Sequence, residues 1–165
     1  MNELDAIQAS LASFTKRLDE VSTDRFNELR KCSFFDPVPS EWLTPIAEQT
    51  VIKTFAAADH LTSEGEDMNA FYVVLYGTAT VYFNKKIVGI IRSGECIGEG
   101  MFFANENLSR SETVFADGQV IAAEIKTTGI DLLHGEAKAY MDKALLLALF
   151  KKLQGANRKI EELLR

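Results

Sequence analysis

The sequence contains few of the residues that bind metal ions or form covalent cross-links. It has two cysteines, Cys32 and Cys96, and two histidines, His60 and His134. The cysteines lie far apart without Cys-x-x-Cys spacing, so they predict neither a zinc site nor a disulfide framework. The histidines lack metal-ligand spacing, and the chain has no Gly-x-Ser-x-Gly motif and no phosphate-loop lysine. We therefore expect a protein that is not an enzyme and that has no metal cofactor.

The sequence also lacks long apolar runs and an excess of positive charge. Its longest apolar run, residues 144–150, is far shorter than the roughly 20 residues of a membrane-spanning helix. Glu3 and Asp5 stand where a signal peptide carries positive charge. Lys and Arg number 18 against 24 Asp and Glu, a net charge of -6, which disfavours contacts with nucleic acid phosphates. These absences predict a cytoplasmic location, no membrane partner and no direct binding to DNA.

The first 50 residues have a helical pattern. Apolar residues at spacings of three and four predict a long helix over residues 4–21, and Ser22-Thr23-Asp24 predicts the N-cap of a second, short helix. Pro37 and Pro39 then break the chain before a third helical segment. The apolar stripe of the first helix consists of Leu4, Ile7, Leu11, Phe14, Leu18 and Val21.

Residues 51–126 have the pattern of an antiparallel β-roll. Short runs rich in Val, Ile, Phe, Tyr and Thr alternate with glycines, as in small sheets and barrels. Asn84-Lys85 is typical of a hairpin turn, and Gly77 is expected where two strands bend away from each other. Eight strands are predicted near residues 51–55, 59–62, 70–76, 78–83, 86–91, 96–98, 111–116 and 119–126.

The helical period returns after residue 126 and predicts a long C-terminal helix. Its stripe is apolar enough that it must pack on the roll or on a second copy of the chain, so we expect a homodimer through this helix. The fold class is therefore α+β, one domain with a helical segment over 1–50, a roll over 51–126 and closing helices over 127–165. The stripe consists of Leu146, Leu149, Leu153, Ala156, Ile160 and Leu163.

A binding site for an anion with hydroxyl groups is predicted near residues 94–111. Gly98 and Glu99 lie at the end of a predicted strand and directly before a predicted helical turn, whose first amides lack partners and suit an anion. Glu99 can accept hydrogen bonds from sugar hydroxyls. Arg110, followed by Ser111, supplies a fixed positive charge that suits phosphate oxygens. The pattern favours a binding module over an enzyme.

These residues resemble the cyclic nucleotide-binding domains of the catabolite-activator and protein-kinase regulatory type. The resemblance covers residues 34–165. It rests on Phe34-Phe35 before a helix, Glu64-Gly65-Glu66, the run Phe71-Tyr72-Val73-Val74-Leu75-Tyr76-Gly77, the pair Gly98-Glu99, the pair Arg110-Ser111 and the closing helix.

The resemblance implies a sensor that holds cAMP or cGMP between a β-roll and the C-terminal helix. Glu99 would then bind the ribose and Arg110 the phosphate, with Ser111 beside it. No helix-turn-helix segment follows the last predicted helix, so the activator's DNA binding is not carried over. The remaining residues that the resemblance implies are the backbone of Gly98, Gly100 and Met101 at the ligand, Val81 and Val88 against the base, and Asn157 at the adenine edge.

Departures from the family pattern leave a second interpretation open. Glu112 stands where the family has a small residue, and its charge would repel the phosphate by roughly 1 kcal/mol when solvated. The loop over residues 104–109 is one or two residues longer than common. The alternative is a degenerate roll that acts as a dimerisation or protein-docking module without nucleotide, in which Glu99 and Arg110 simply pair with each other.

Overall fold

The computed structural model describes residues 3–102 and 109–165. Eight strands and several helices follow the predicted order, so the α+β roll with a long C-terminal helix is confirmed. The helices are α1 (Glu3–Arg30), α2 (Ser40–Glu48), α3 (Thr127–Asp131) and α4 (Gly135–Leu163), with short 3-10 turns η1 (Ser33–Phe35) and η2 (Glu99–Phe102). The strands are β1 (Thr50–Phe55), β2 (His60–Thr62), β3 (Ala70–Tyr76), β4 (Thr78–Phe83), β5 (Lys86–Arg92), β6 (Cys96–Ile97), β7 (Thr113–Ala116) and β8 (Val120–Lys126).

The strands form two antiparallel four-stranded sheets, in the orders β1-β8-β3-β6 and β2-β7-β4-β5. Alternate residues of β3 face opposite sides of the first sheet, because successive strand side chains point to opposite faces. Tyr72 and Val74 point between the sheets, into an apolar cluster with Val81, Val114 and Ala122. The outer face of the same sheet packs on the helices, in a second cluster that contains Phe71, Val73, Ala123, Ile125, Leu43, Met141 and Leu145.

The N-terminal helix differs from the prediction. Residues 22–24 do not begin a second helix, since α1 runs without a break from Glu3 to Arg30. A break would require a new helix nucleus and would leave backbone groups unpaired at both new ends. Ser22, Thr23 and Asp24 are good N-cap residues, but one cap is worth only about 1 kcal/mol and does not outweigh that cost. The end of α1 is fixed instead by Arg30, whose guanidinium donates to the carbonyls of Phe35 and Val38 at 2.8 and 2.7 Å.

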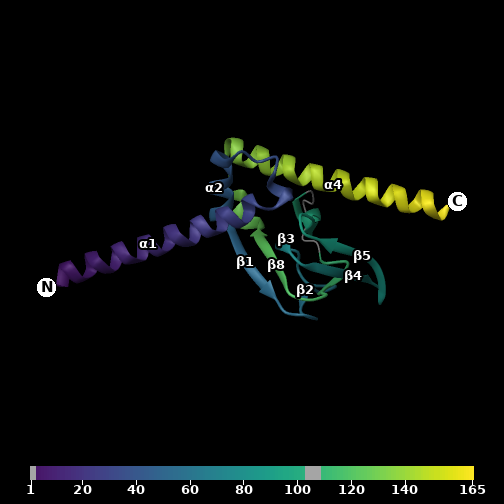
Figure 1. Ribbon diagram of the computed structural model, residues 1–165, viewed down its shortest axis with the longest axis horizontal. Helices are drawn as coiled ribbons and strands as arrows, with labels where there is room; N and C mark the ends of the chain where they lie inside the picture. Colours follow the sequence, from purple (N-terminus) through teal and green to yellow (C-terminus); the bar gives the residue numbers. More distant parts are fainter. Residues whose placement is uncertain (1–2, 103–108) are drawn as a thin grey trace.

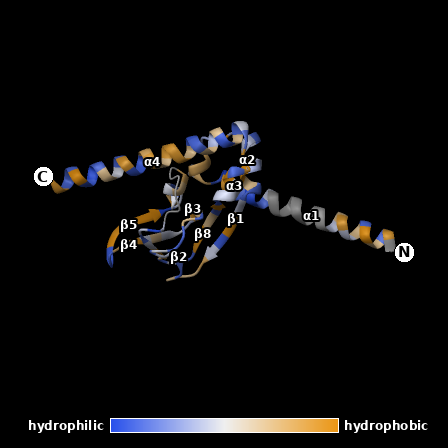
Figure 2. Cartoon of the chain, turned by 180° about the vertical axis from the view of Figure 1, so that it is seen from behind, coloured by the Kyte–Doolittle hydropathy of each residue, from blue (hydrophilic) through white to orange (hydrophobic). Residues whose placement is uncertain are grey.

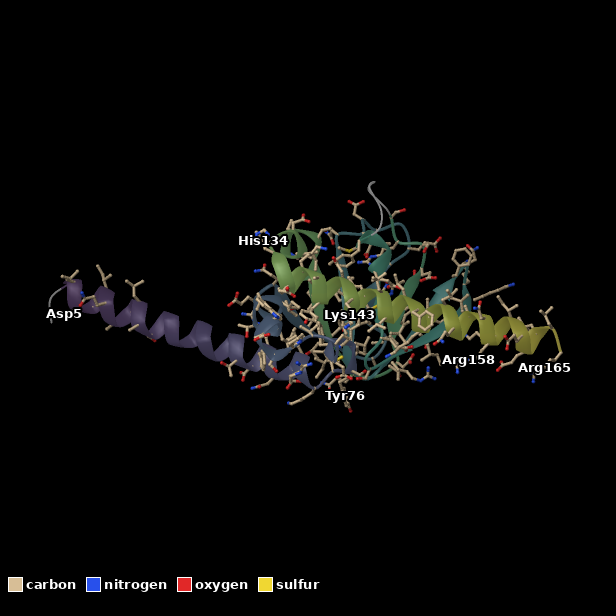
Figure 3. All side chains as sticks on the ribbon, turned by 90° about the horizontal axis from the view of Figure 1, so that it is seen from above. Asp5, Tyr76, His134, Lys143, Arg158 and Arg165 are labelled. Atoms are coloured by element: carbon tan, nitrogen blue, oxygen red, sulfur yellow. The ribbon has the colours of Figure 1, made fainter. Side chains whose placement is uncertain are left out.

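The two long helices extend from the body in opposite directions (Figure 1). Figure 3 labels Asp5 near the free end of α1 and Arg165 at the free end of α4. Apolar and polar residues alternate along the projecting half of α4 (Figure 2). No helix in residues 3–102 and 109–165 is both long and apolar enough to cross a membrane. The predicted long loop over 104–109 lies, apart from Ser109, outside the described residues.

Gly77 joins the two sheets, as predicted from its position between two strands. β3 ends one residue before it in the first sheet, and β4 begins one residue after it in the second. Its φ of +89° is in the left-handed region, and a Cβ there would collide with the carbonyl oxygen of Gln119. Only glycine satisfies both conditions without strain.

We therefore expect Gly77→Ala to lower the free energy of unfolding by about 2–4 kcal/mol, from the φ penalty together with a collision against backbone that cannot yield. Urea denaturation followed by circular dichroism measures it. Gly89→Ala is the matched control, because a Cβ at this β5 glycine meets nothing within 4 Å. Equal midpoints for the two variants would contradict this account of Gly77.

Candidate functional site

The predicted anion site is built on the turn after β6. Ile97 ends the strand, Gly98 has φ +83°, and η2 follows directly with Glu99 and Met101 buried. A Cβ at Gly98 would collide with Nη1 of Arg110. The glycine is therefore required twice, for the left-handed backbone and for the space that the guanidinium occupies.

Arg110 is buried, with 6% of its surface exposed, and its guanidinium is only partly satisfied. Nη2 donates to the carbonyl of Ala70 at 2.5 Å, but Nη1 is buried without a hydrogen-bond partner among the described residues. Burial lowers the pKa of this guanidinium from its usual value. Its backbone is fixed by pairing with the segment before β3, through hydrogen bonds to Glu66 O and from Gly65 N, each 2.8 Å. A buried cationic donor without a partner is costly, and an anion at Nη1 would remove that cost.

Glu99 pairs with a residue that the sequence analysis did not assign. Its Oε1 lies 2.5 Å from Nζ of Lys152 on α4, and the same Nζ donates to the carbonyl of Cys96 at 2.7 Å. The ion-pair partner of Glu99 is thus Lys152, whereas the alternative interpretation had paired it with Arg110. This contact ties α4 to the turn that carries Gly98. Burial, together with the nearby Glu99 charge, raises the pKa of the Cys96 thiol to about 12, so this thiol stays protonated.

A signal for Lys152 appears once the buried side of α4 is known. Met141, Leu145 and Ala148 follow one another at spacings of four and three on the buried side of α4. Continuing that period by four residues leads to Lys152 rather than to an apolar residue. A lysine on the inner face of a closing helix indicates a buried acidic partner, here Glu99.

The other predicted residues near the site differ in their exposure to solvent. Val81 is buried between the sheets, whereas Val88, on the edge strand β5, is 45% exposed. Ser111 and Glu112 are exposed beside Arg110. Because an exposed carboxylate is screened by water, the repulsion expected from Glu112 is the value for a solvated charge, roughly 1 kcal/mol or less.

Asn157 is exposed on α4 and lies about 140° around the helix axis from Lys152, at 100° per residue. The structure thus brings together Gly98, Glu99, Arg110 and Lys152, and places Asn157 on another side of the closing helix. The assignments of Val88 and Asn157 to the base stay predictions.

A cluster of three polar side chains lies on the inner face of the first sheet, next to Arg110. Tyr72 of β3 donates its hydroxyl to Oε2 of Glu124 on β8 at 2.8 Å, and Lys53 of β1 pairs with the same oxygen at 2.5 Å. Burial alone would raise the pKa of Glu124, but these two hydrogen bonds outweigh burial and lower it. Burial and the hydrogen bond to Glu124 raise the pKa of Tyr72. None of these three residues was predicted from the sequence to have a role in the site.

The chain is similar to known proteins in both sequence and fold. A cGMP-dependent protein kinase from Plasmodium berghei is 24% identical over 139 residues, which are 82% of this chain but 16% of the kinase. The regulatory domain of Toxoplasma gondii PKA with cAMP superposes with a TM-score of 0.62 and 18% identity, over 76% of this chain and 49% of that one. The regulatory subunit of a cAMP-independent protein kinase A from Trypanosoma brucei gives 0.67 and 17%, over 87% and 49%.

The structural likenesses establish the fold, and a family model establishes the family. This chain spans less than a fifth of the kinase and about half of each solved chain. The model of the cyclic nucleotide-binding domain matches residues 52–134, which is half of the chain and contains Gly98, Glu99 and Arg110. With the roll, the Gly98 turn and the buried arginine in place, the chain belongs to the cyclic nucleotide-binding domain family.

Proposed function

We propose that the chain is a non-catalytic sensor domain that binds cAMP or cGMP between the roll and α4. One observation carries the proposal: Nη1 of Arg110 is buried, positively charged and without a hydrogen-bond partner in residues 3–102 and 109–165, and it lies against Gly98, where a Cβ would collide with it. This arrangement is costly in the absence of an anion and suits one that approaches along the Gly98 backbone.

The cyclic phosphate would lie against Arg110 and the backbone of Gly98, Gly100 and Met101. Arg110 is held by Ala70 through Nη2, so its guanidinium is already oriented when the ligand arrives. An oriented donor loses less conformational entropy on binding than a flexible surface side chain. Ser111, exposed beside Arg110, is available to the same ligand.

The ribose 2′-hydroxyl would donate to Glu99. Lys152 occupies Oε1 of this carboxylate, and a carboxylate has about four acceptor positions on two oxygens, so a hydroxyl and an ammonium can share it. A ligand at Glu99 therefore touches the same group that holds α4. Binding can then shift the position of α4, provided that the contacts of Lys152 differ between the free and bound states.

The base would extend from the ribose towards Val81 and Val88, and Asn157 on α4 is proposed to meet its edge. Val88 is 45% exposed and offers apolar surface, whereas Val81 is buried between the sheets. A purine ring against Val88 loses contact with water. An Asn amide both donates and accepts hydrogen bonds, so it suits adenine and guanine alike.

We further propose that two copies associate through α4, in the cytoplasm and without direct binding to DNA. Five apolar side chains on the projecting half of this helix are each more than half exposed: Leu146, Phe150, Leu153, Ile160 and Leu163. They recur at spacings of three, four and seven, which is the pattern of a helix seam.

The second candidate function is a docking module that does not need nucleotide. It is favoured by the ion pair between Glu99 and Lys152, because this carboxylate already has a counter-ion without a ligand. Isothermal titration calorimetry of the chain with cAMP, with cGMP and with 5′-AMP decides between the two. Saturable binding of a cyclic nucleotide supports the sensor, and no heat with either cyclic nucleotide supports the docking module.

A sharper prediction concerns Glu99. Glu99→Gln replaces a charged acceptor by a neutral one, so we expect affinity for the ribonucleotide to fall by about 1 kcal/mol, or roughly fivefold. The 2′-deoxy ligand lacks the hydroxyl, and its affinity should change less. Calorimetry with both ligands on both proteins gives the comparison. Equal affinity of the unmodified chain for the ribose and deoxyribose forms would exclude a contact between Glu99 and the sugar.

A further inference from the structure

Arg110 contacts Tyr72 as well as Ala70. Apart from the hydrogen bond to Ala70, the guanidinium lies over the ring of Tyr72, with Cζ 5.9 Å from the ring centroid. Tyr72 is two residues beyond Ala70 on β3, and period-two alternation places both on the same face of the strand. One strand therefore supplies both the carbonyl and the aromatic surface on which this cation rests.

Tyr72 is in turn held by two further strands. It pairs directly with Glu124 in the register of β3 and β8, and its hydroxyl donates to that carboxylate at 2.8 Å. Lys53, on β1 at the other side of β8, binds the same oxygen and lies 5.9 Å from the Tyr72 ring centroid. Lys53, Glu124 and Tyr72 thus form a polar row across β1, β8 and β3.

Burying the polar atoms of this row costs desolvation free energy. Glu124 is 5% exposed, and Tyr72 belongs to the apolar cluster between the sheets. The Lys53 side chain is 42% exposed, but the Glu124 carboxylate has lost most of its contact with water, and such desolvation offsets much of the attraction within an ion pair. The row also affects the charge near Arg110. The negative charge of Glu124 favours the charged form of Arg110, but the Glu124 carboxylate is bound by Lys53 and Tyr72.

We infer that Lys53, Glu124 and Tyr72 are positioning residues for the phosphate contact of Arg110. Tyr72 supplies the surface on which the guanidinium lies, and Lys53 keeps the Glu124 charge from neutralising it, so that Nη1 stays open to an anion. This inference rests on the proposed function, in which Arg110 binds the cyclic phosphate. It assigns a role to three residues that themselves need not touch the ligand.

The charge part of the inference predicts a loss and a rescue. Lys53→Met leaves Glu124 without its counter-ion, so the carboxylate becomes a competitor for Arg110, and nucleotide affinity should fall by about tenfold. Adding Glu124→Gln removes the competing charge, and the double variant should return to within about threefold of the unmodified chain. A merely structural role predicts the reverse, a double variant at least as weak as the single one.

The ring part is tested with two substitutions at one position. Tyr72→Phe keeps the ring and should cost about threefold in affinity or less, whereas Tyr72→Leu removes the ring and should cost about tenfold. This pair does not disturb Lys53, so it keeps the inference testable if Lys53→Met fails to fold.

The experiment is calorimetric titration of the full chain and these variants with cAMP and cGMP, with folding checked by urea denaturation. Lys138→Met is the matched control, because it breaks a half-exposed lysine–aspartate pair on α4 and should leave affinity unchanged. Binding by the unmodified chain without rescue in the double variant, or with equal affinity of Tyr72→Leu and Tyr72→Phe, overturns the inference alone. Absence of binding by the unmodified chain overturns the proposed function and the inference together.

Discussion

Arg110→Ala is expected to reduce cyclic nucleotide affinity by about 2–4 kcal/mol, or roughly 30- to 1,000-fold. The loss is large because the guanidinium is buried and oriented before the ligand arrives, so its contact with the phosphate is not shared with water. Without it, the phosphate would keep only neutral partners, the backbone amides and Ser111. Calorimetry, or displacement of a fluorescent cyclic nucleotide when affinity is weak, measures the change.

Stability separates this effect from simple damage to the fold. The lowered pKa of Arg110 means that burial disfavours its charged form in the folded state. Its removal should therefore leave the urea midpoint unchanged or raise it slightly. Arg92→Ala is the control, since it removes the same charge from an exposed position at the end of β5 and should bind normally. Normal binding by Arg110→Ala would show that Arg110 does not contact the nucleotide.

The roll could be predicted because its signals are local. The hairpin at Asn84-Lys85 has positive φ at both residues, which is the turn that such residues favour between twisted strands. Gly77 marks the change of sheet for a similarly local reason. Predicted and observed strands agree within two residues at their ends, for example 111–116 against Thr113–Ala116.

The contacts among Lys53, Glu124 and Tyr72 depend on which strands pair and in which register. Local sequence patterns do not define either. Lys53 and Glu124 are 71 residues apart and meet because β1 pairs with β8. A partial signal exists in β8, where Val120, Ala122 and Glu124 share the inward face. A carboxylate at an inward strand position predicts a buried partner, but it does not identify which strand supplies that partner.

The reach of Lys152 to Glu99 was missed for a related reason. The sequence placed residues 151–157 on a closing helix, but which residue faces the roll depends on how α4 is rotated about its axis. That rotation is set by the buried residues near the start of the helix: Ala137, Met141, Ala144 and Leu145.

Because all the fully buried residues of α4 precede Leu146, a chain that ends after Phe150 should still fold. We expect it to lose nucleotide affinity by about tenfold or more, since Glu99 is left as a buried carboxylate without its counter-ion beside an anionic ligand. It should also lose self-association, because Leu153, Ile160 and Leu163 are removed from the exposed stripe. Calorimetry and sedimentation equilibrium measure the two effects on the same preparation.

The two losses have separate causes, and one substitution distinguishes them. Lys152→Met in the full chain removes the tether to Glu99 but leaves the exposed stripe intact, because Lys152 lies on the inner face of α4. It should weaken nucleotide binding about as much as the truncation and leave association unchanged. If the shortened chain still dimerises, the seam lies elsewhere, and the exposed apolar residues Leu4, Ile7 and Leu11 of α1 become the surface to substitute next. If Lys152→Met binds cyclic nucleotide as the unmodified chain does, α4 does not act on the site through Glu99, and its effect must come from the part of the helix beyond Lys152.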